Sequence, residues 1–514
     1  PKYGEQFQAD NYQQTQPTGK RGLIQYLSSA HFPGIGEKTA EKIIEKLGEE
    51  AMERILNDET ALDGITGLTK KKKEMIREVI QQNQGTEKLM FELTNLGFTP
   101  AIAQKIIGMY KDKARAVLDE DPYVLLQRIE GLGFRRMDSI AQSMGIDPDD
   151  TSRLKGALFV VTRDFCYQTG DTYLMAEVLI TQAQRLLESC QNYLIEPDRL
   201  VDALNELIRE GVVFSDENRI AIASLYYAEL GISNALSKRI TASKLEISKE
   251  KIDEAIQQTE EKFEIQYDAS QKEAIYRIMT EPLFVLTGGP GTGKSTVIDG
   301  LLQYYKQMFP DHAIALCAPT GAAAKKLREV TKGDARTIHK LLDVKPFGID
   351  EMQYKDEYDQ LPYDLIIVDE SSMIDIELFM MLLSGVKSGA LLLFVGDEDQ
   401  LPSVGAGSVL HDMLDSGYIP SCQLRQVYRQ KNGSSIVENS IKMRTGDTNL
   451  IEDSSFEIIR VKNQIELEQE AISVVQRECG EYRKRDLKLY SPVRNPKYAV
   501  STYFLNKQLH NLFG

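Results

Sequence analysis

The sequence has no long apolar run, few cysteines and no excess of basic side chains. None of its apolar stretches approaches the ~20 residues that a helix needs to cross a bilayer, and none has the features of a signal peptide. The five cysteines are scattered and form no CxxC pair, which argues for reduced thiols in a cytosol and against a zinc site. The net charge of −16 argues against a protein that coats polyanions without specificity, although a local basic groove is compatible with it.

What is present describes an ordinary folded protein of several domains. The chain has 514 residues, enough for three or four domains, and it is 42% hydrophobic and 27% charged. The first half has mainly helical patterns, whereas strands and helices alternate from about residue 266 onward. This alternation predicts a parallel sheet with helices on both faces in the second half.

A Gly-rich stretch near residue 290 has the pattern of a phosphate-binding loop. Residues 283–287 form a short apolar run typical of a buried strand, and a helix opens at Lys294. The intervening glycines let successive backbone N–H groups converge on an anion. An accidental Gly-rich turn is the alternative, and the flanking strand and helix disfavour it. The residues expected to hold a nucleoside triphosphate are Gly288, Gly289, Pro290, Gly291, Thr292, Gly293, Lys294, Ser295 and Thr296.

Three residues around this loop have specific expected roles. Lys294 would reach the β- and γ-phosphates, and the Ser295 hydroxyl would take one place on Mg²⁺. Gln271 lies upstream, ahead of an amphipathic helix, and its amide offers the donor and acceptor that suit an adenine edge. A helix-capping role for that segment is equally compatible with the sequence.

Adjacent carboxylates follow a second buried strand at residues 365–368. Asp369 would hold Mg²⁺, directly or through water, and Glu370 would polarise the attacking water. Such a pair downstream of a phosphate loop indicates hydrolysis of the nucleotide rather than its storage.

Two further residues complete the expected catalytic set of Lys294, Glu370, Gln400 and Arg429. Gln400 follows a third strand at residues 390–395 and is placed to sense the γ-phosphate. Arg429 could reach the same phosphate from a second domain.

Pro319, Thr320 and His339 are candidate contacts to a nucleic acid strand. A strand at residues 313–317 ends in Pro319 and Thr320, and a helix start of this kind could hold a phosphate. His339 follows a short loop and could do the same, although a lone histidine is more often structural.

A small unit recurs in the first half, with the form apolar-x-Gly-apolar-Gly followed by a helix. It is clear at residues 32–43 and 129–141, and weaker at 65–76 and 96–107. Glycines at a helix start expose backbone N–H groups, where a phosphate oxygen can dock without sequence readout. Alternatively the glycines only make tight turns in a helical bundle, and in the second and third units this structural role is favoured. The expected DNA contacts are Gly34, Gly36, Lys38, Gly131 and Gly133.

Residues 151–265 suggest a winged-helix-like module. The expected helices lie at 154–167, 174–188, 197–210 and 225–242. A strand pair is expected at 212–214 and 219–222, joined by a turn at 215–218.

Together these motifs, in this order, resemble superfamily 1 helicases, and the residues within each motif resemble those of RecD. The segments that carry the resemblance are 286–294, 318–323, 368–373, 396–405 and 428–430, with 121–123 ahead of the fourth Gly-containing unit. The tandem helix-hairpin-helix units resemble those of the long-N-terminus, RecD-like ATP-dependent DNA helicases of bacteria. The resemblance implies ATP- and Mg²⁺-dependent translocation 5′ to 3′ on single-stranded DNA between two RecA-like domains. It also implies a small strand-parting hairpin at about 343–363.

The chain departs from this family in two places. Nothing between Gln430 and Gly514 matches two later motifs of the second RecA-like domain. The family's upstream barrel domain is not represented before Pro1. We therefore expect only part of the second RecA-like domain.

The predicted fold is multidomain, with a helical N-terminal half followed by α/β RecA-like P-loop domains with parallel sheets. The expected division is a linker at 1–22, the tandem helix-hairpin-helix region at 23–150, the winged-helix-like region at 151–265, the first RecA-like domain at 266–420 and part of the second at 421–514.

The predicted function is that of an ATP-dependent DNA helicase in repair or recombination. The alternatives are an RNA-directed motor and a nucleotide-switched DNA-binding module without translocation. Expected partners are single-stranded DNA, single/double-strand junctions and a single-strand-binding protein. The protein is expected to be a bacterial cytoplasmic, nucleoid-associated monomer without a membrane segment.

Overall fold

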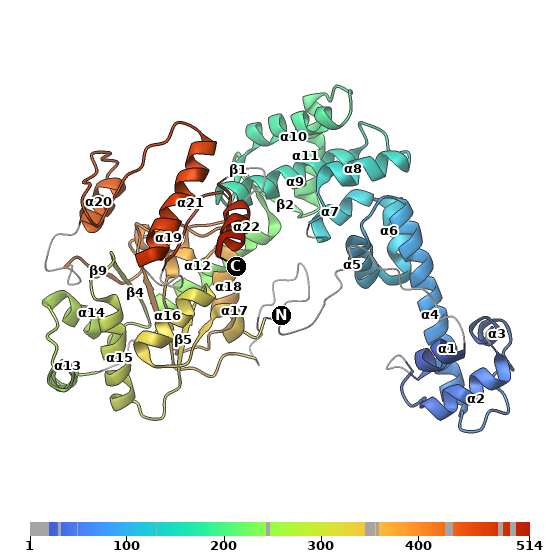
Figure 1. Cartoon of the computed structure of the whole chain (residues 1–514), viewed down its shortest axis with the longest axis horizontal. Coiled ribbons are helices and arrows are strands. Elements are labelled where there is room, and N and C mark those ends of the chain that lie inside the picture. Colours follow the sequence, from blue (N-terminus) through green and yellow to red (C-terminus); the bar gives the residue numbers. More distant parts are fainter. Residues whose placement is uncertain are drawn as a thin grey trace. The chain divides into compact units, whose positions relative to one another are not determined.

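The computed structural model describes most of the chain, and its elements are labelled in Figure 1. The described residues are 20–28, 32–48, 50–129, 131–242, 247–344, 355, 359–426, 435–481, 487–493 and 500–513. The chain divides into two compact units, of which one comprises Pro1–Gly289 with Gly293–Arg425 and the other Pro290–Thr292 with Gln426–Gly514.

The first unit begins with two helix-hairpin-helix units that share one apolar core. Their helices are α1 (Lys20–Leu27), α2 (Glu37–Leu47), α3 (Ala51–Asn57) and α4 (Lys70–Asn95). Phe32, Ile43 and Ile76 are among the buried side chains of that core. The first hairpin turns at Gly34, whose φ of 82° is a left-handed value that favours glycine. The Lys72 ammonium donates a 2.8 Å hydrogen bond to the Gly34 carbonyl oxygen and so joins the two units.

A second pair of helix-hairpin-helix units follows. As in the first pair, a basic side chain of the second member donates to a glycine carbonyl oxygen of the first member. Its elements are α5 (Pro100–Tyr110), η1 (Lys111–Lys113), α6 (Ala114–Glu120), η2 (Pro122–Val124), α7 (Leu125–Arg128) and α8 (Phe134–Ser143). Arg136 of the fourth unit donates through Nη2 to the carbonyl oxygen of Gly97 in the third, at 3.1 Å. The helical first half predicted from the repeated glycines is confirmed.

A buried ion pair fixes the second pair of units to α9 (Thr151–Thr169). Arg153 Nε donates to Asp138 Oδ1 at 2.7 Å, and the two side chains are 0% and 1% exposed. The Tyr123 hydroxyl donates to the same carboxylate at 2.6 Å. Arg153 also donates to the carbonyl oxygen of Leu187 on α10 (Ala176–Cys190), so this one side chain joins α8, α9 and α10.

A winged-helix-like module comes next, and its sheet is larger than predicted. Three helices, α10 (Ala176–Cys190), α11 (Pro197–Arg209) and α12 (Ala223–Ile240), accompany an antiparallel sheet of order β1-β3-β2. The hairpin strands are β2 (Val213–Asp216) and β3 (Arg219–Ile222), with a shorter turn than expected. The prediction of a helix from residue 174 was wrong by two residues, because β1 (Leu174–Met175) pairs with β3.

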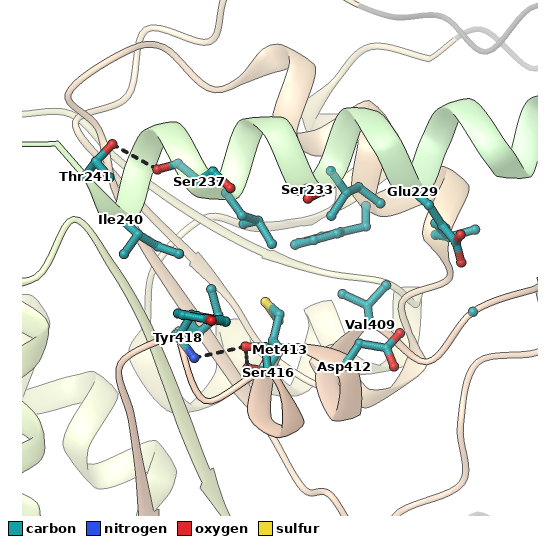
Figure 2. A pocket seen from close by; sticks show the side chains of 16 residues that line it. Glu229, Ser233, Ser237, Ile240, Thr241, Val409, Asp412, Met413, Ser416 and Tyr418 are labelled. Atoms are coloured by element: carbon teal, nitrogen blue, oxygen red, sulfur yellow. Dashed lines mark hydrogen bonds between the residues drawn. The ribbon is translucent and has the colours of Figure 1, made fainter. Parts of the chain in front are cut away.

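Helix α12 packs on α18 (Ile376–Gly385) of the domain that follows. Near its C-terminal end, Arg239 donates to the carbonyl oxygens of Val386 at 2.9 Å and Ala390 at 3.1 Å. Together with α19 (Val409–Asp415), α12 also encloses a mainly apolar groove of about 570 Å³ (Figure 2). The lining residues include none of the predicted nucleotide or DNA contacts, so this groove is separate from the site described below.

The second half of the first unit is built on a six-stranded parallel sheet of order β6-β5-β7-β8-β4-β9. The strands are β4 (Leu283–Gly288), β5 (Ile314–Ala318), β6 (Ala335–Thr337), β7 (Leu365–Val368), β8 (Leu391–Gly396) and β9 (Ser421–Leu424). The predicted parallel α/β sheet is confirmed. β9 pairs with β4, so this sheet continues to Leu424.

Alternate residues of the central strands face opposite layers of helices, as the pleat requires. Phe284 and Leu286 pack against the layer that contains α13 (Lys249–Phe263), α14 (Ala269–Thr280) and α15 (Lys294–Met308). Leu283 and Val285 pack against the layer that contains α17 (Ile338–Leu341), α18 and α19. Buried on both faces, these strands read in the sequence as continuous apolar runs.

In the second unit, the described residues after 434 form three helices. These are α20 (Ser435–Arg444), α21 (Gln464–Glu481) and α22 (Thr502–Phe513). The predicted hairpin at 343–363 lies largely outside the described residues. Within the part of the chain that is described, no helix combines the length and the apolarity that spanning a bilayer requires.

Candidate nucleotide and DNA site

The phosphate-binding loop lies where β4 ends and α15 begins. Its last glycine, Gly293, has φ of 89°, a left-handed value at the N-cap, and no side chain caps the helix there. The first backbone N–H groups of α15 are therefore left for a ligand, and the helix dipole favours an anion at this end. The loop predicted from the sequence thus has the strand-to-helix setting that phosphate binding needs.

Lys294 lies at the centre of the charges in this site. Its ammonium donates to the carbonyl oxygens of Gly288 and, at 3.2 Å, of Gly289. Burial lowers the pKa of Lys294, while the charges of Asp397, Glu370 and Asp369 act in the opposite direction. The ammonium is therefore within electrostatic reach of three carboxylates that follow β8 and β7.

The two carboxylates after β7 differ in their surroundings. Asp369 Oδ1 accepts a 2.9 Å hydrogen bond from the Glu370 backbone N–H. Burial, and then the neighbouring charge of Glu370, raise the pKa of Asp369. A cation beside Asp369 would compensate this cost, and a nucleotide-borne Mg²⁺ needs few protein ligands because phosphates and water supply the others. The chemistry of Asp369 therefore fits Mg²⁺, and Ser295, in the first turn of α15, stays the predicted second ligand. Among the described residues, no group of three or more His, Cys, Asp or Glu forms a metal site by itself.

Glu370 has a strained backbone. Its φ of 53° and ψ of 42° are left-handed values that residues other than glycine rarely adopt. Such conformations cost about 1–3 kcal/mol and cluster at functional sites. The side chain is partly buried and forms an ion pair with Lys326, whose Nζ lies 3.3 Å from Glu370 Oε1. Sequence reasoning did not identify Lys326, because no local pattern links residues so far apart in the chain.

The strand β8 brings two polar side chains to the same edge of the sheet. Gln400 lies in the exposed loop after β8, where its backbone N–H donates to the Asp397 carbonyl oxygen at 3.2 Å. Asp397 is only 2% exposed and contributes to the electrostatic environment of Lys294. The sequence analysis gave Asp397 no role, although its place directly after a buried strand was a usable signal.

Gln271 caps the start of α14. With Asp268 it forms a capping box in which Gln271 Oε1 accepts from the Asp268 backbone N–H at 3.1 Å. This bond occupies the amide oxygen but not the amide nitrogen. The capping alternative is thus confirmed, and an adenine contact through the nitrogen stays a prediction.

The predicted single-strand contacts lie at the ends of β5 and β6, which neighbour each other in the sheet. Pro319 and Thr320 are half-buried, and the Thr320 hydroxyl accepts from the Ala323 backbone N–H at 3.2 Å as the N-cap of α16 (Gly321–Thr331). His339 is exposed on α17. The structure brings the three residues to the same sheet edge as Asp369 and Glu370, whereas Arg429 lies outside the described residues.

The four N-terminal hairpins fall into two kinds. In the second and third, Thr69 and Thr99 cap the following helix by accepting from the backbone N–H of Lys72 and Ile102. In the first and fourth, the N-caps are Gly36 and Gly133, and neither helix has a side-chain cap.

The glycines of the two hairpins without a side-chain cap differ in the space around them. A Cβ on Gly34 would lie 3.5 Å from the Lys72 side chain. A Cβ placed on Gly36, Gly131 or Gly133 would meet no atom within 4 Å. Lys38, in the first turn of α2, is exposed. The space at Gly36, Gly131 and Gly133 is compatible with a phosphate, and the DNA contacts of these two hairpins stay a prediction.

Two family models match the chain. One is described as an AAA domain and matches residues 266–468, and the other as the HHH domain of the ATP-dependent RecD2 DNA helicase, matching residues 82–173. The second covers the whole second pair of helix-hairpin-helix units but only the end of the first pair, since it begins within α4.

Curated relatives agree with these models. The ATP-dependent RecD2 DNA helicase of Deinococcus radiodurans is 30% identical over 82% of this chain. The RecBCD enzyme subunit RecD of Mycobacterium tuberculosis is 37% identical over 34% of this chain. The chain spans 58% of the length of the first relative and 35% of the second. A solved structure of Pif1 helicase from Candida albicans is 17% identical, with a TM-score of 0.29 over 43% of this chain and 56% of that one, a likeness too slight to bear on the argument. The resemblance that the motifs indicate is confirmed by the sequence relatives.

Proposed function

From its RecD-like motifs and relatives, we propose that this protein is an ATP-dependent DNA helicase that translocates 5′ to 3′ on single-stranded DNA and unwinds duplex during repair or recombination. The observation that supports it best is that the phosphate-binding loop after β4, Asp369 and Glu370 after β7, and Asp397 after β8 all follow parallel strands of one sheet. Three separate strands of the sheet thereby contribute to one phosphate site, and the candidate strand contacts follow the adjacent β5 and β6.

Hydrolysis of ATP assigns a role to each residue of this site. Lys294 and the N-terminus of α15 would hold the β- and γ-phosphates, and Gln271 would contact the base. Ser295 and Asp369 would hold Mg²⁺, which supplies positive charge to the phosphates when bound. Glu370 would take the proton of the attacking water, and Gln400 would sense the γ-phosphate. Arg429 would add a guanidinium from the second domain.

DNA would contact the protein at two places. A single strand would lie at Pro319, Thr320 and His339, and the first and fourth hairpins would hold duplex backbone through Gly34, Gly36, Lys38, Gly131 and Gly133. These contacts suit a single/double-strand junction. A bacterial cytoplasmic monomer that works beside a single-strand-binding protein would fit this role.

Nucleic acid activation of the ATPase tests this proposal against its alternatives. We expect single-stranded DNA to stimulate turnover of the full-length protein strongly and RNA of the same length to do so weakly. Stronger activation by RNA would indicate an RNA-directed motor. No activation by either would indicate a nucleotide-switched binding module without translocation.

A further inference from the structure

One ion pair joins the predicted ATP site to α16, the helix whose N-cap, Thr320, is a predicted contact to the DNA strand. Glu370 follows β7, and Lys326 lies on α16, the helix that follows the neighbouring strand β5. Lys326 Nζ lies 3.3 Å from Glu370 Oε1. The charge of Lys326 also acts on the pKa values of Lys294 and Asp369.

The two partners of this pair differ in exposure. The Lys326 side chain is 61% exposed and that of Glu370 only 19%. A pair with one partner so open to water contributes little to folding. The pair instead affects the Glu370 carboxylate, because an ammonium at hydrogen-bond distance occupies an oxygen that a general base needs free.

Lys326 is also placed to meet a DNA phosphate. It lies five residues after Gly321, the first residue of α16, about one and a half turns along the helix. Helical side chains lean toward the N-terminus of their helix, and Thr320, a candidate strand contact, is the N-cap of α16. A phosphate held there would attract the exposed ammonium, and Lys326 cannot pair with both anions at full strength.

We propose that Lys326 is a positioning residue that restrains Glu370 in the DNA-free protein and releases it when a strand phosphate takes its ammonium. Released Glu370 accepts a proton from the attacking water as the water oxygen bonds to the γ-phosphorus. The bond from that phosphorus to the β–γ bridging oxygen breaks, and ADP leaves with the electron pair. This inference rests on the proposed function, since it explains how a DNA strand would accelerate ATP hydrolysis.

Three variants of the full-length protein test the proposal. The probe is a single-stranded oligo(dT), and the ATPase turnover number and the KM for ATP are measured with and without it. Lys326→Ala should raise the DNA-free turnover several-fold with little change in KM, so that the stimulation ratio falls. Lys326→Arg, which can form the same ion pair, should retain the parental ratio.

Lys325→Ala is the matched control. Lys325 is the preceding lysine of α16, 75% exposed, and its ammonium lies 3.9 Å from Glu329 rather than near the phosphate site. This variant should match the parent in both conditions.

The proposal is overturned if Lys326→Ala leaves the DNA-free turnover and the ratio at parental values. It is also overturned if both rates fall by the same factor, because Lys326 would then support the active geometry of Glu370. A parent that oligo(dT) does not stimulate would contradict the proposed function instead. The DNA-free rate of Lys326→Ala would still decide whether Lys326 restrains Glu370.

Discussion

At the scale of single residues, the site combines burial, strain and opposite charges in a small space. Burial lowers the pKa of Lys294 and raises that of Asp369, which means that each charged form is held at a cost in the absence of a ligand. Glu370 adds a left-handed backbone to these costs. Bound ATP with its cation would offset the two electrostatic costs, which supports a highly charged ligand at the predicted site.

Two substitutions should separate nucleotide binding from hydrolysis. Lys294→Ala should abolish ATP hydrolysis in a folded protein, because phosphate charge stabilisation is lost while the core is untouched. Glu370→Gln should still bind ATP, but its turnover should be slower by a factor of at least about 10², since general bases contribute at least that much. Fluorescent-nucleotide titration and steady-state ATPase assays measure the two effects. Parental turnover in Lys294→Ala would disprove the assignment of the loop, and failure of Glu370→Gln to bind ATP would make Glu370 a metal or structural residue.

A residue far from this site should control stability rather than activity. Asp138 is the buried partner of Arg153, so Asp138→Asn would leave the guanidinium without a counter-charge and should cost about 3–5 kcal/mol of unfolding free energy. Urea denaturation measures this loss. Asp119→Asn removes a partner from the exposed Arg115–Asp119 pair and should change stability by about 0–1 kcal/mol. Equal effects of the two substitutions would contradict the structural role of the buried pair.

At the scale of elements, the four hairpins are of two kinds. In two of them a threonine side chain caps the following helix, and in the other two the following helix has no side-chain cap. We therefore expect each pair of units to contain one hairpin that contacts a phosphate and one that is structural. The contacts from Lys72 to Gly34 and from Arg136 to Gly97 then hold the two members of each pair in register.

Matched substitutions at two hairpins should distinguish binding from capping. Gly36 has φ of −88°, so Gly36→Ala is compatible with the backbone and would place a methyl group where a phosphate would dock. It should weaken duplex binding and reduce the salt dependence of affinity, with little change in stability. Thr69→Ala should instead cost about 1 kcal/mol of stability through the lost cap and leave DNA binding unchanged. Duplex titrations over a range of salt, with thermal unfolding alongside, would show the opposite pattern if Gly36 were structural.

The elements that could be predicted are those with strong local signals. β7 was predicted with its observed bounds because Leu365–Val368 is a continuous apolar run that ends at two carboxylates. β1, β6 and β9 were missed because none of them is a continuous apolar run of four residues, and each is defined by its pairing with a distant strand. The Lys326–Glu370 pair was missed for the same reason, since only the folded sheet brings α16 beside the end of β7. For Gln271 the sequence left two roles open, a helix cap and an adenine contact. The structure shows the cap, which uses the amide oxygen, and the adenine contact through the amide nitrogen stays a prediction.

At the scale of the whole molecule, the proposed function requires ATP turnover to be linked to movement between domains. Arg429, which lies outside the described residues, follows β9 in sequence and is the residue expected to reach the nucleotide from the second domain. A guanidinium there would neutralise charge on the γ-phosphate only when the two domains close on ATP.

Arg429→Ala should therefore impair turnover more than binding. We expect a modest change in ATP affinity and a fall in the DNA-stimulated rate of about 10³ or more, the scale of other arginine fingers. Stimulated turnover within a few-fold of the parent would show that Arg429 is only a surface ion-pair residue. The measurement is steady-state ATPase of the full-length variant at saturating single-stranded DNA.

Strand displacement from tailed duplexes directly tests whether this protein unwinds DNA while it translocates 5′ to 3′. The full-length protein is mixed with ATP and a duplex that carries either a 5′ or a 3′ single-stranded tail, and the displaced strand is quantified, with Lys294→Ala as the inactive control. We expect ATP-dependent unwinding of the 5′-tailed duplex, little unwinding of the 3′-tailed one, and none by the control. Unwinding of neither duplex by a protein that hydrolyses ATP, or equal unwinding by Lys294→Ala, would contradict it.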